Sequence, residues 1–287
     1  MYRVKAGGMP EKRKLILIIS LTRCRTLCTL AGMLNWKSKC LGAALALATL
    51  PLCAQTITVP NHSFESQSAP ASYPFVNISV DSWKKNAEPV WYSPAFGAYG
   101  IPWVGTAGVF LDVNPYANHQ GSQVGYMLAV PQVSLFQDYS TSPTHDFNAT
   151  YDVGSAYNLT VGVYGKNSLA LGSTLTLSLY YRDGLDNRVT VGSTVVTYGP
   201  ATFPGTAPLN LVDYSVNIPA VQAGDAWAGQ HIGVELASTI PIEMTSFGNW
   251  DFDNVRISVV PEPATTSLLG LGVGALLVAR SRSRRSS

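Results

Sequence analysis

The sequence has no cysteine over most of its length. All four cysteines (Cys24, Cys28, Cys40 and Cys53) precede Gln55. The chain after Gln55 therefore has neither disulfide bonds nor thiol chemistry. We expect its stability to come from an apolar and aromatic core.

The same part of the chain has few cations. Between Gln55 and Pro261 it holds 6 Lys and Arg against 15 Asp and Glu, a net charge of −9, although the whole chain carries a formal +2. This acidity argues against nucleic acid as a partner and suits calcium or neutral glycans better than polyanions.

Familiar catalytic motifs are missing. The chain has no His-Glu-x-x-His, no Gly-x-Ser-x-Gly and no glycine-rich phosphate loop followed by Lys. Asp251 and Asp253 lie two apart on one expected strand, so they do not face each other across a cleft as a glycosidase pair must. We therefore expect no enzyme activity and no organic cofactor.

A helical period is also missing between Gln55 and Pro261, where period-two alternation of apolar residues dominates instead. This pattern predicts strands that bury one face and expose the other. The clearest examples are 157–163, 175–181, 212–218 and 232–236, with turns at 182–187, 198–208 and 223–225. We expect an all-β fold, an antiparallel β-sandwich of jelly-roll type, over residues 55–259.

The N-terminal residues have the features of an export signal. A basic segment at 33–39 precedes an apolar stretch at 40–53, and Ala54 offers a small residue for cleavage. We expect a signal peptide over 33–54 and a mature chain that begins at Gln55. Residues 1–32 do not fit this scheme and are interpreted as a spurious or extended N-terminus.

The C-terminal residues combine three features in order. Pro261, Glu262 and Pro263 are followed by 16 residues without a formal charge (264–279) and an Arg-rich tail (280–285). The apolar run favours a single, marginal transmembrane helix with the arginines on the cytoplasmic side. An ordinary tail anchor or a core helix is the alternative.

This terminus, residues 260–285, resembles the sorting signal of PEP-CTERM proteins. The resemblance implies processing by exosortase, a membrane-embedded transpeptidase, after export. It implies a protein held at the inner membrane by its C-terminal segment and then delivered to the cell envelope or extracellular matrix.

A second resemblance covers the predicted sandwich, residues 55–259, which we call the body. The segments VPNHSFES (59–66), GSQVGYM (121–127), SLFQDY (134–139), YNLTVGVY (157–164) and FDNVRIS (252–258) are similar, in this order, to galactose-binding-like jelly rolls and certain carbohydrate-binding modules. The resemblance supports the β-sandwich and implies sugar binding.

Calcium is the metal that the acidic residues favour. The first and last strands of a jelly roll can be neighbours, so Glu65 and Asp253 are expected to meet, with Asp251 in support. Carboxylates brought together repel or share a cation, and oxygen ligands favour Ca²⁺. The resemblance supports Glu65 and Asp253 but places Asn254 where a second Asp is usual. The alternative is that Asp253 only binds backbone amides.

Aromatic residues predict where a sugar would bind. They gather between residues 83 and 116, a segment rich in Gly and Pro, and flat rings suit the apolar side of a pyranose. We expect ligand contacts from Trp91, Tyr92, Trp103, Tyr116 and Asn118, although tryptophans in a sandwich without disulfides are usually core residues.

The sequence thus predicts an exported protein whose β-sandwich binds or organises exopolysaccharide without catalysis. The alternatives are a purely structural matrix protein without a defined ligand, and a secreted hydrolase acting on polysaccharide.

Overall fold

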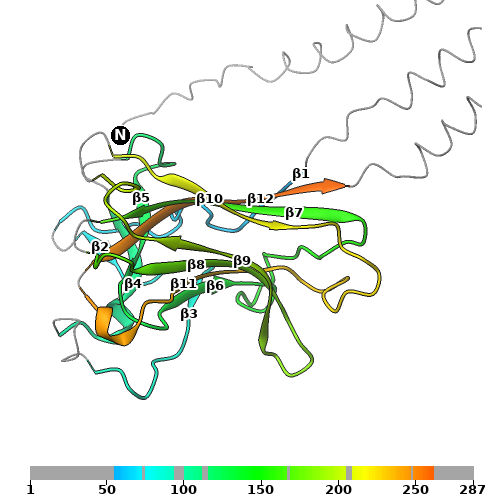
Figure 1. The fold of residues 1–287 in the computed structure, drawn as a ribbon, viewed down its shortest axis with the longest axis horizontal. Helices are drawn as coiled ribbons and strands as arrows, with labels where there is room; N and C mark the ends of the chain where they lie inside the picture. Colours follow the sequence, from blue (N-terminus) through cyan, green and yellow to red (C-terminus); the bar gives the residue numbers. More distant parts are fainter. Residues whose placement is uncertain are drawn as a thin grey trace, which may run out of the picture. The chain divides into compact units, whose positions relative to one another are not determined.

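A computed structural model describes residues 55–72, 75–93, 100–111, 116–166, 169–204, 209–246 and 248–261 (Figure 1). Within these ranges the regular structure is almost entirely β, in two antiparallel sheets. The predicted sandwich is therefore confirmed. All these residues belong to one compact unit of the chain, Leu52–Pro263.

The strands alternate with short turns along the chain. Their bounds are β1 (Gln55–Ile57), β2 (Val76–Asn77), β3 (Lys84–Lys85), β4 (Ala107–Leu111), β5 (Gln123–Leu128), β6 (Ser134–Gln137), β7 (Ser155–Gly165), β8 (Thr174–Arg182), β9 (Arg188–Thr197), β10 (Val212–Ile218), β11 (Gly233–Ser238) and β12 (Asn249–Pro261). Two 3₁₀ turns, η2 (Trp103–Gly105) and η3 (Ile242–Met244), complete the described elements.

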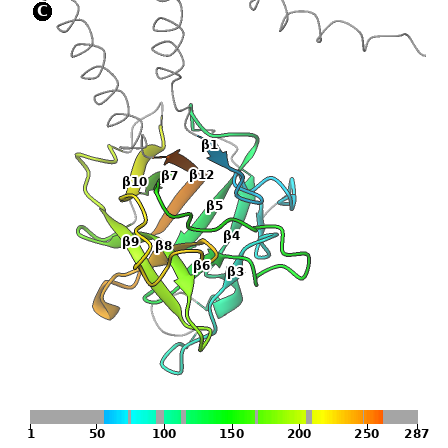
Figure 2. The same ribbon diagram turned by 90° about the vertical axis from the view of Figure 1, so that its right-hand side faces the viewer.

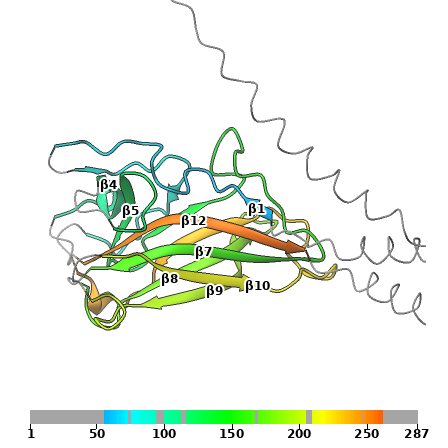
Figure 3. The same cartoon turned by 90° about the horizontal axis from the view of Figure 1, so that it is seen from above.

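The two sheets form the two layers of the sandwich. The seven-stranded sheet has the order β10-β7-β12-β5-β4-β2, with β1 beside β12, and the five-stranded sheet has the order β3-β6-β11-β8-β9. Figures 1 and 2 show β7, β10 and β12 in one layer and β8, β9 and β6 in the other. Figure 3 shows β12 and β7 running side by side.

The core lies between the layers. Leu159, Val161 and Val163 of β7 are fully buried, as their alternation predicts. At one end of the core, Phe64 stacks on Trp83 with ring centroids 5.5 Å apart. Phe64 also meets Phe252 of β12 edge-on, at 5.2 Å. Each such aromatic pair adds to the stabilisation that burial gives.

The pattern of β8 differs from the predicted one at a bulge. Alternation places Leu175, Leu177, Leu179 and Tyr181 on the buried side. The register with β9 shifts between Leu179 and Tyr180, and the buried tyrosine is Tyr180. The extra residue is Val191 of β9, whereas β8 keeps a continuous register with β11. Tyr180 therefore lies on the face opposite Leu177 and Leu179 and is buried there, where its hydroxyl binds Asp138.

The first and last strands of the described unit are neighbours. β1 pairs with β12 antiparallel, and Gln55 lies opposite Val259. This confirms the expectation that the ends of the body meet.

The described residues were expected to contain no membrane span, because the predicted one lies beyond Pro261. Among the described residues no helix is both long and apolar enough to cross a bilayer. The predicted span at 264–279 lies outside the described residues, as do the signal peptide (33–54), Glu262, Pro263 and the Arg-rich tail.

Candidate functional site

A buried carboxylate, Asp251, lies at the centre of the seven-stranded sheet. Trp250 and Phe252 point into the core and are fully buried, so Asp251 lies on the opposite, outer side of β12. Its neighbours across the ladder are Tyr126 of β5 and Tyr164 of β7. The Asp251 side chain is nevertheless 0% exposed. Such a carboxylate needs strong hydrogen-bond and charge partners.

Three donors supply these partners. The Tyr116 hydroxyl donates to Oδ2 of Asp251, and the Asn249 amide donates to Oδ1. The Lys166 ammonium lies 3.0 Å from Oδ2. A carboxylate, a phenol and an ammonium group therefore meet around one pair of oxygens. This constellation, which we call the Asp251 cluster, holds a proton acceptor and proton donors in contact.

Aromatic rings surround the Asp251 cluster. The Tyr116 and Tyr164 rings have centroids 5.2 Å apart, and the Lys166 Nζ lies 4.8 Å from the centroid of the Phe110 ring. Burial raises the pKa of the neighbouring Tyr126 to about 12. The Lys166 side chain is 38% exposed, so it connects the buried carboxylate with solvent.

Glu65 and Asp253 meet at one loop, as predicted. The Glu65 carboxylate accepts hydrogen bonds from the amides of Ser122 and Gln123 at 2.9 and 2.7 Å. The Asp253 Oδ2 accepts from the amide of Gln120 at 2.6 Å. Between these contacts Gly121 has a φ of +100°, and a Cβ there would lie 2.4 Å from Cδ of Glu65. The loop therefore needs glycine at this position.

One carboxylate oxygen of Asp253 accepts no hydrogen bond from the described residues. Asp253 is 0% exposed, and its Oδ1 is buried without a hydrogen-bond partner among the residues that the structure describes. Burial, with a small contribution from the Glu65 charge, raises the pKa of Asp253 to about 7, against the lowering effects of the Gln120 and Asn254 amides and of His119. A cation at this place would satisfy the oxygen and favour the ionised form.

The full predicted calcium set is not assembled. Asp251 is engaged in its own cluster. The described residues contain no group of three or more His, Cys, Asp or Glu side chains that could hold a metal. Asn254 lies at a bulge of β12 with a φ of +56°, a left-handed conformation that Asn accepts more readily than most residues. Calcium binding by Glu65 and Asp253 therefore stays a prediction.

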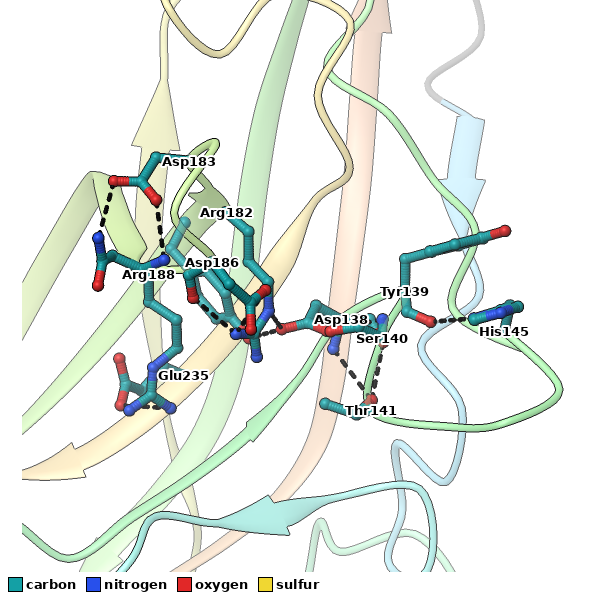
Figure 4. Close-up of polar contacts among 12 residues, drawn as sticks. Asp138, Tyr139, Ser140, Thr141, His145, Arg182, Asp183, Asp186, Arg188 and Glu235 are labelled. Carbon is teal, nitrogen blue, oxygen red and sulfur yellow. Dashed lines mark hydrogen bonds and ion pairs between the residues drawn. The ribbon is translucent and has the colours of Figure 1, made fainter.

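A polar network lies on the other sheet (Figure 4). Asp138, directly after β6, accepts from the Tyr180 hydroxyl at 2.5 Å and from Nε of Arg182 at 2.8 Å. Burial alone would raise the pKa of Asp138, but the hydrogen bonds from Ser140 and Tyr180 and the charge of Arg182 outweigh it, and the pKa lies below its ordinary value. The network ties β6 to β8.

A cleft of about 670 Å³ adjoins this network. Its lining includes Trp91, Gln132, Arg188, Glu235 and Ile240. The cleft therefore lies over β11 of the five-stranded sheet, and β9 contributes Arg188 to its lining. The Asp251 cluster belongs to the other sheet. Figure 4 shows the Arg188–Glu235 pair beside the Asp138 network.

The predicted sugar contacts divide between core and cleft. Trp91 lines the cleft and donates through Nε1 to Oε1 of Gln132 at 3.3 Å. Trp103 is 5% exposed, and its Nε1 donates to the Asn86 carbonyl. Tyr92 is 7% exposed and packs edge-on against Trp103. The structure thus gives Tyr92 and Trp103 core positions.

The other two predicted contacts lie elsewhere. Tyr116 belongs to the Asp251 cluster. The amide of Asn118 pairs with both backbone groups of Leu211, at 2.7 and 2.8 Å. The structure therefore brings only Trp91 of the predicted set to the cleft. Arg188 and Glu235 also line the cleft and were not predicted, although alternation along β9 and β11 could have indicated them.

The geometry defines a β-sandwich with a buried acid–base cluster on one sheet and an open cleft on the other. The chain belongs to the HpiC1-like cyclase family, because the HpiC1 cyclase family model matches residues 55–258. No curated protein matches the chain.

Solved structures that are similar to the chain include two cyclases and a xylan-binding domain. A cyclase from Fischerella sp. TAU is 18% identical, with 73% of this chain and 98% of that chain covered and a TM-score of 0.49. A Fischerella Stig cyclase in complex with an indole compound is also 18% identical, covering 73% and 99%, with a TM-score of 0.46. The CBM22-1 xylan-binding domain of a Paenibacillus barcinonensis protein is 12% identical, covering 74% and 98%, with a TM-score of 0.39.

Family membership corrects one expectation. A protein without enzyme activity was predicted because common hydrolytic and phosphate-binding motifs are missing, but the chain belongs to a cyclase family. Those motifs have fixed local spacing. Tyr116, Lys166 and Asp251 are far apart in the sequence and come into contact only in the folded sheet. A search for motifs of fixed local spacing therefore cannot find such a cluster.

The raised pKa of Asp253 has a consequence for stability. The folded protein retains the Asp253 proton at pH values where the unfolded chain has lost it, so stability falls as the pH rises from about 4 to about 7. At roughly 1.4 kcal/mol per pKa unit the loss is on the order of 4 kcal/mol. We expect Asp253→Asn to remove this loss, measured by urea unfolding in chelator at about pH 5 and about pH 8.

Calcium provides the complementary measurement. We expect millimolar calcium to stabilise the wild type near pH 8 and to leave Asp253→Asn unchanged, with the exposed Asp186→Asn as a matched control. Equal calcium responses of wild type and Asp253→Asn would exclude a cation at this carboxylate.

Proposed function

We propose that the chain is a cyclase and that Asp251 and Lys166 are its acid–base pair. Membership of the HpiC1-like cyclase family supports the reaction class. The observation that carries the assignment of residues is the buried Asp251 carboxylate 3.0 Å from a partly exposed Lys166 ammonium.

The chemistry of ring closure fits this pair. Closing a ring in an unsaturated substrate replaces one π bond with one σ bond and leaves the composition unchanged. One proton is delivered to the substrate and one is removed, so an acid and a base are needed side by side. In this proposal Lys166 delivers the proton, Asp251 accepts the other, and Tyr116 orients the carboxylate.

The aromatic residues around the cluster suit a cationic intermediate. Ring faces attract positive charge, and the attraction increases when water is excluded. Phe110, Tyr116, Tyr126 and Tyr164 lie close to the pair. The proposed substrate is therefore an unsaturated, largely apolar molecule that reaches the pair from the partly exposed Lys166 side.

Conversion without a change of mass tests the cyclase. The purified body is incubated with a panel of unsaturated aromatic compounds, indoles included, and products of unchanged mass but altered retention are sought by chromatography and mass spectrometry. We expect Asp251→Asn to lower the rate by about 100-fold or more, because general acid–base catalysis contributes about that much.

The matched control is Asp213→Asn. Asp213 also forms an ion pair on the seven-stranded sheet, with Arg256, but its side chain is 54% exposed. Its replacement is expected to leave the rate unchanged. An Asp251→Asn variant that folds and retains the wild-type rate would refute the assignment.

The export pathway is a second part of the proposal. The basic and apolar segment at 33–54 and the Pro-Glu-Pro, apolar and Arg-rich order at 261–285 support export, retention at the inner membrane and processing by exosortase. The protein would then reach the envelope or extracellular matrix.

Mass spectrometry of both ends tests this pathway. We expect the released protein to begin at Gln55 and to end near Pro263, and the cell-associated form to retain residues 264–285. A protein recovered with its first 54 residues attached would contradict it.

Glycan binding is a second candidate function, supported by Trp91 in the cleft. An indole ring beside the polar groups of Gln132, Arg188 and Glu235 has the mixed apolar and polar character that a sugar ring needs. The exopolysaccharide of the envelope is the proposed ligand. A structural matrix protein without a defined ligand would leave this cleft without a role.

Affinity electrophoresis tests the cleft. We expect the wild type to be retarded in gels containing neutral polysaccharide. Trp91→Ala should lose most of this retardation, because loss of one stacking ring costs about 1 kcal/mol or more. The buried Trp103→Phe serves as a control for general effects on the core. Equal migration of wild type and Trp91→Ala in every gel would exclude this function.

A further inference from the structure

The floor of the cleft contains a fixed donor beside a fixed acceptor. Nη1 of Arg188 on β9 lies 3.2 Å from Oε1 of Glu235 on β11. The Arg188 guanidinium also lies over the Phe136 ring, 3.9 Å from its centroid. The two side chains are 26% and 18% exposed. Stacking and partial burial therefore hold the pair in place while leaving it within reach of a ligand.

The hydrogen bonds of this floor are incomplete. Nη1 of Arg188 is buried and has no hydrogen-bond partner in the described part of the chain, because its approach to Glu235 is that of an ion pair without hydrogen-bond geometry. Ser238, also in the cleft lining, is 1% exposed, and its hydroxyl has no partner among the described residues either. Buried polar groups without partners are costly. Both point to a ligand that brings hydrogen-bonding groups of its own.

One wall of the cleft presents a flat ring in a fixed position. Trp91 is held through its Nε1 contact with Gln132. The Asn86 side chain in turn binds the Gln132 carbonyl at 2.6 Å and the Ser134 amide at 2.9 Å. The segment that carries Trp91 is thereby anchored to β6. A ring that stacks on Trp91 enters a cleft whose polar groups are already in place.

We propose that Arg188 and Glu235 select a vicinal diol on a neutral sugar ring that stacks on Trp91. One hydroxyl of the diol accepts from Arg188, and the adjacent hydroxyl donates to Glu235, which is possible because each hydroxyl is both donor and acceptor. This inference rests on the glycan binding proposed above and names its specificity.

Charge excludes the acidic alternative. A uronic acid would bring its carboxylate close to Glu235 and to a body with 15 acidic and 6 basic residues between Gln55 and Pro261. Its charge would be repelled by Glu235 and would compete with Glu235 for Arg188. The cleft is therefore a site for neutral sugars.

The position of the glycosidic linkage decides which polymers meet this requirement. A hexopyranose linked through C1 and C4 keeps free hydroxyls on C2 and C3. A hexopyranose linked through C1 and C3 has no vicinal pair of free hydroxyls within the chain. Both polymers keep the ring face that stacks on Trp91, so the two linkages separate the diol contact from the stacking contact.

Paired polysaccharides of one monomer test the selection. Soluble β-1,4- and β-1,3-glucans, galactans and mannans are placed in affinity gels with the wild type, Arg188→Lys and Glu235→Gln. We expect the wild type to prefer the 1,4-linked member of at least one pair by about tenfold or more, the amount that one hydrogen bond to a charged group supplies. Both variants should bind the two members nearly equally.

The outcomes separate this inference from the function beneath it. No retardation of the wild type in any gel overturns the proposed glycan binding itself. Binding that Trp91→Ala abolishes, but that shows no preference between linkages or keeps it in both variants, overturns only the diol selection. Arg256→Lys and Asp213→Asn, which alter the ion pair on the other sheet, serve as matched controls, and thermal unfolding confirms that each variant is folded.

Discussion

The alternation of β12 between two buried environments is the constraint on which the rest depends. Trp250 and Phe252 fill the space between the sheets, and the alternating Asp251 and Asp253 lie on the outer side, where they are equally buried. Two carboxylates without solvent on a central strand require partners from other parts of the chain. The donors around Asp251 and the 120–123 loop at Asp253 meet this requirement. Fold and chemistry are thus fixed by the same residues.

The two sheets carry different kinds of surface. The seven-stranded sheet holds a closed acid–base cluster surrounded by rings, and the five-stranded sheet holds an open cleft whose floor is an ion pair. Substitutions at one sheet are separated from the other by the apolar core.

Much of the fold follows from the sequence, because period-two alternation reports burial directly. Leu159, Val161 and Val163 show this for β7. The sequence could not show the bulge at Leu179 and Tyr180, since a bulge depends on the partner strand. The approach of Glu65 and Asp253 was predicted from the pairing of the first and last strands, but the loop at 120–123 that binds both was not. Asp251 was expected to support a calcium ion and is instead engaged by Lys166 and Tyr116. Such long-range polar contacts carry no periodic signal. Alternation could indicate Arg188 and Glu235 as polar residues of their strands, but it could not show that β9 and β11 bring the two together.

The pairing of β1 with β12 places Gln55 opposite Val259. The beginning and the end of the sandwich therefore lie side by side on paired strands, about 5 Å apart. A short linker could join these residues, and new ends could be opened in the exposed turn after Arg182. The sandwich is thus a suitable scaffold for circular permutation, with its connectivity rearranged and its layers unchanged.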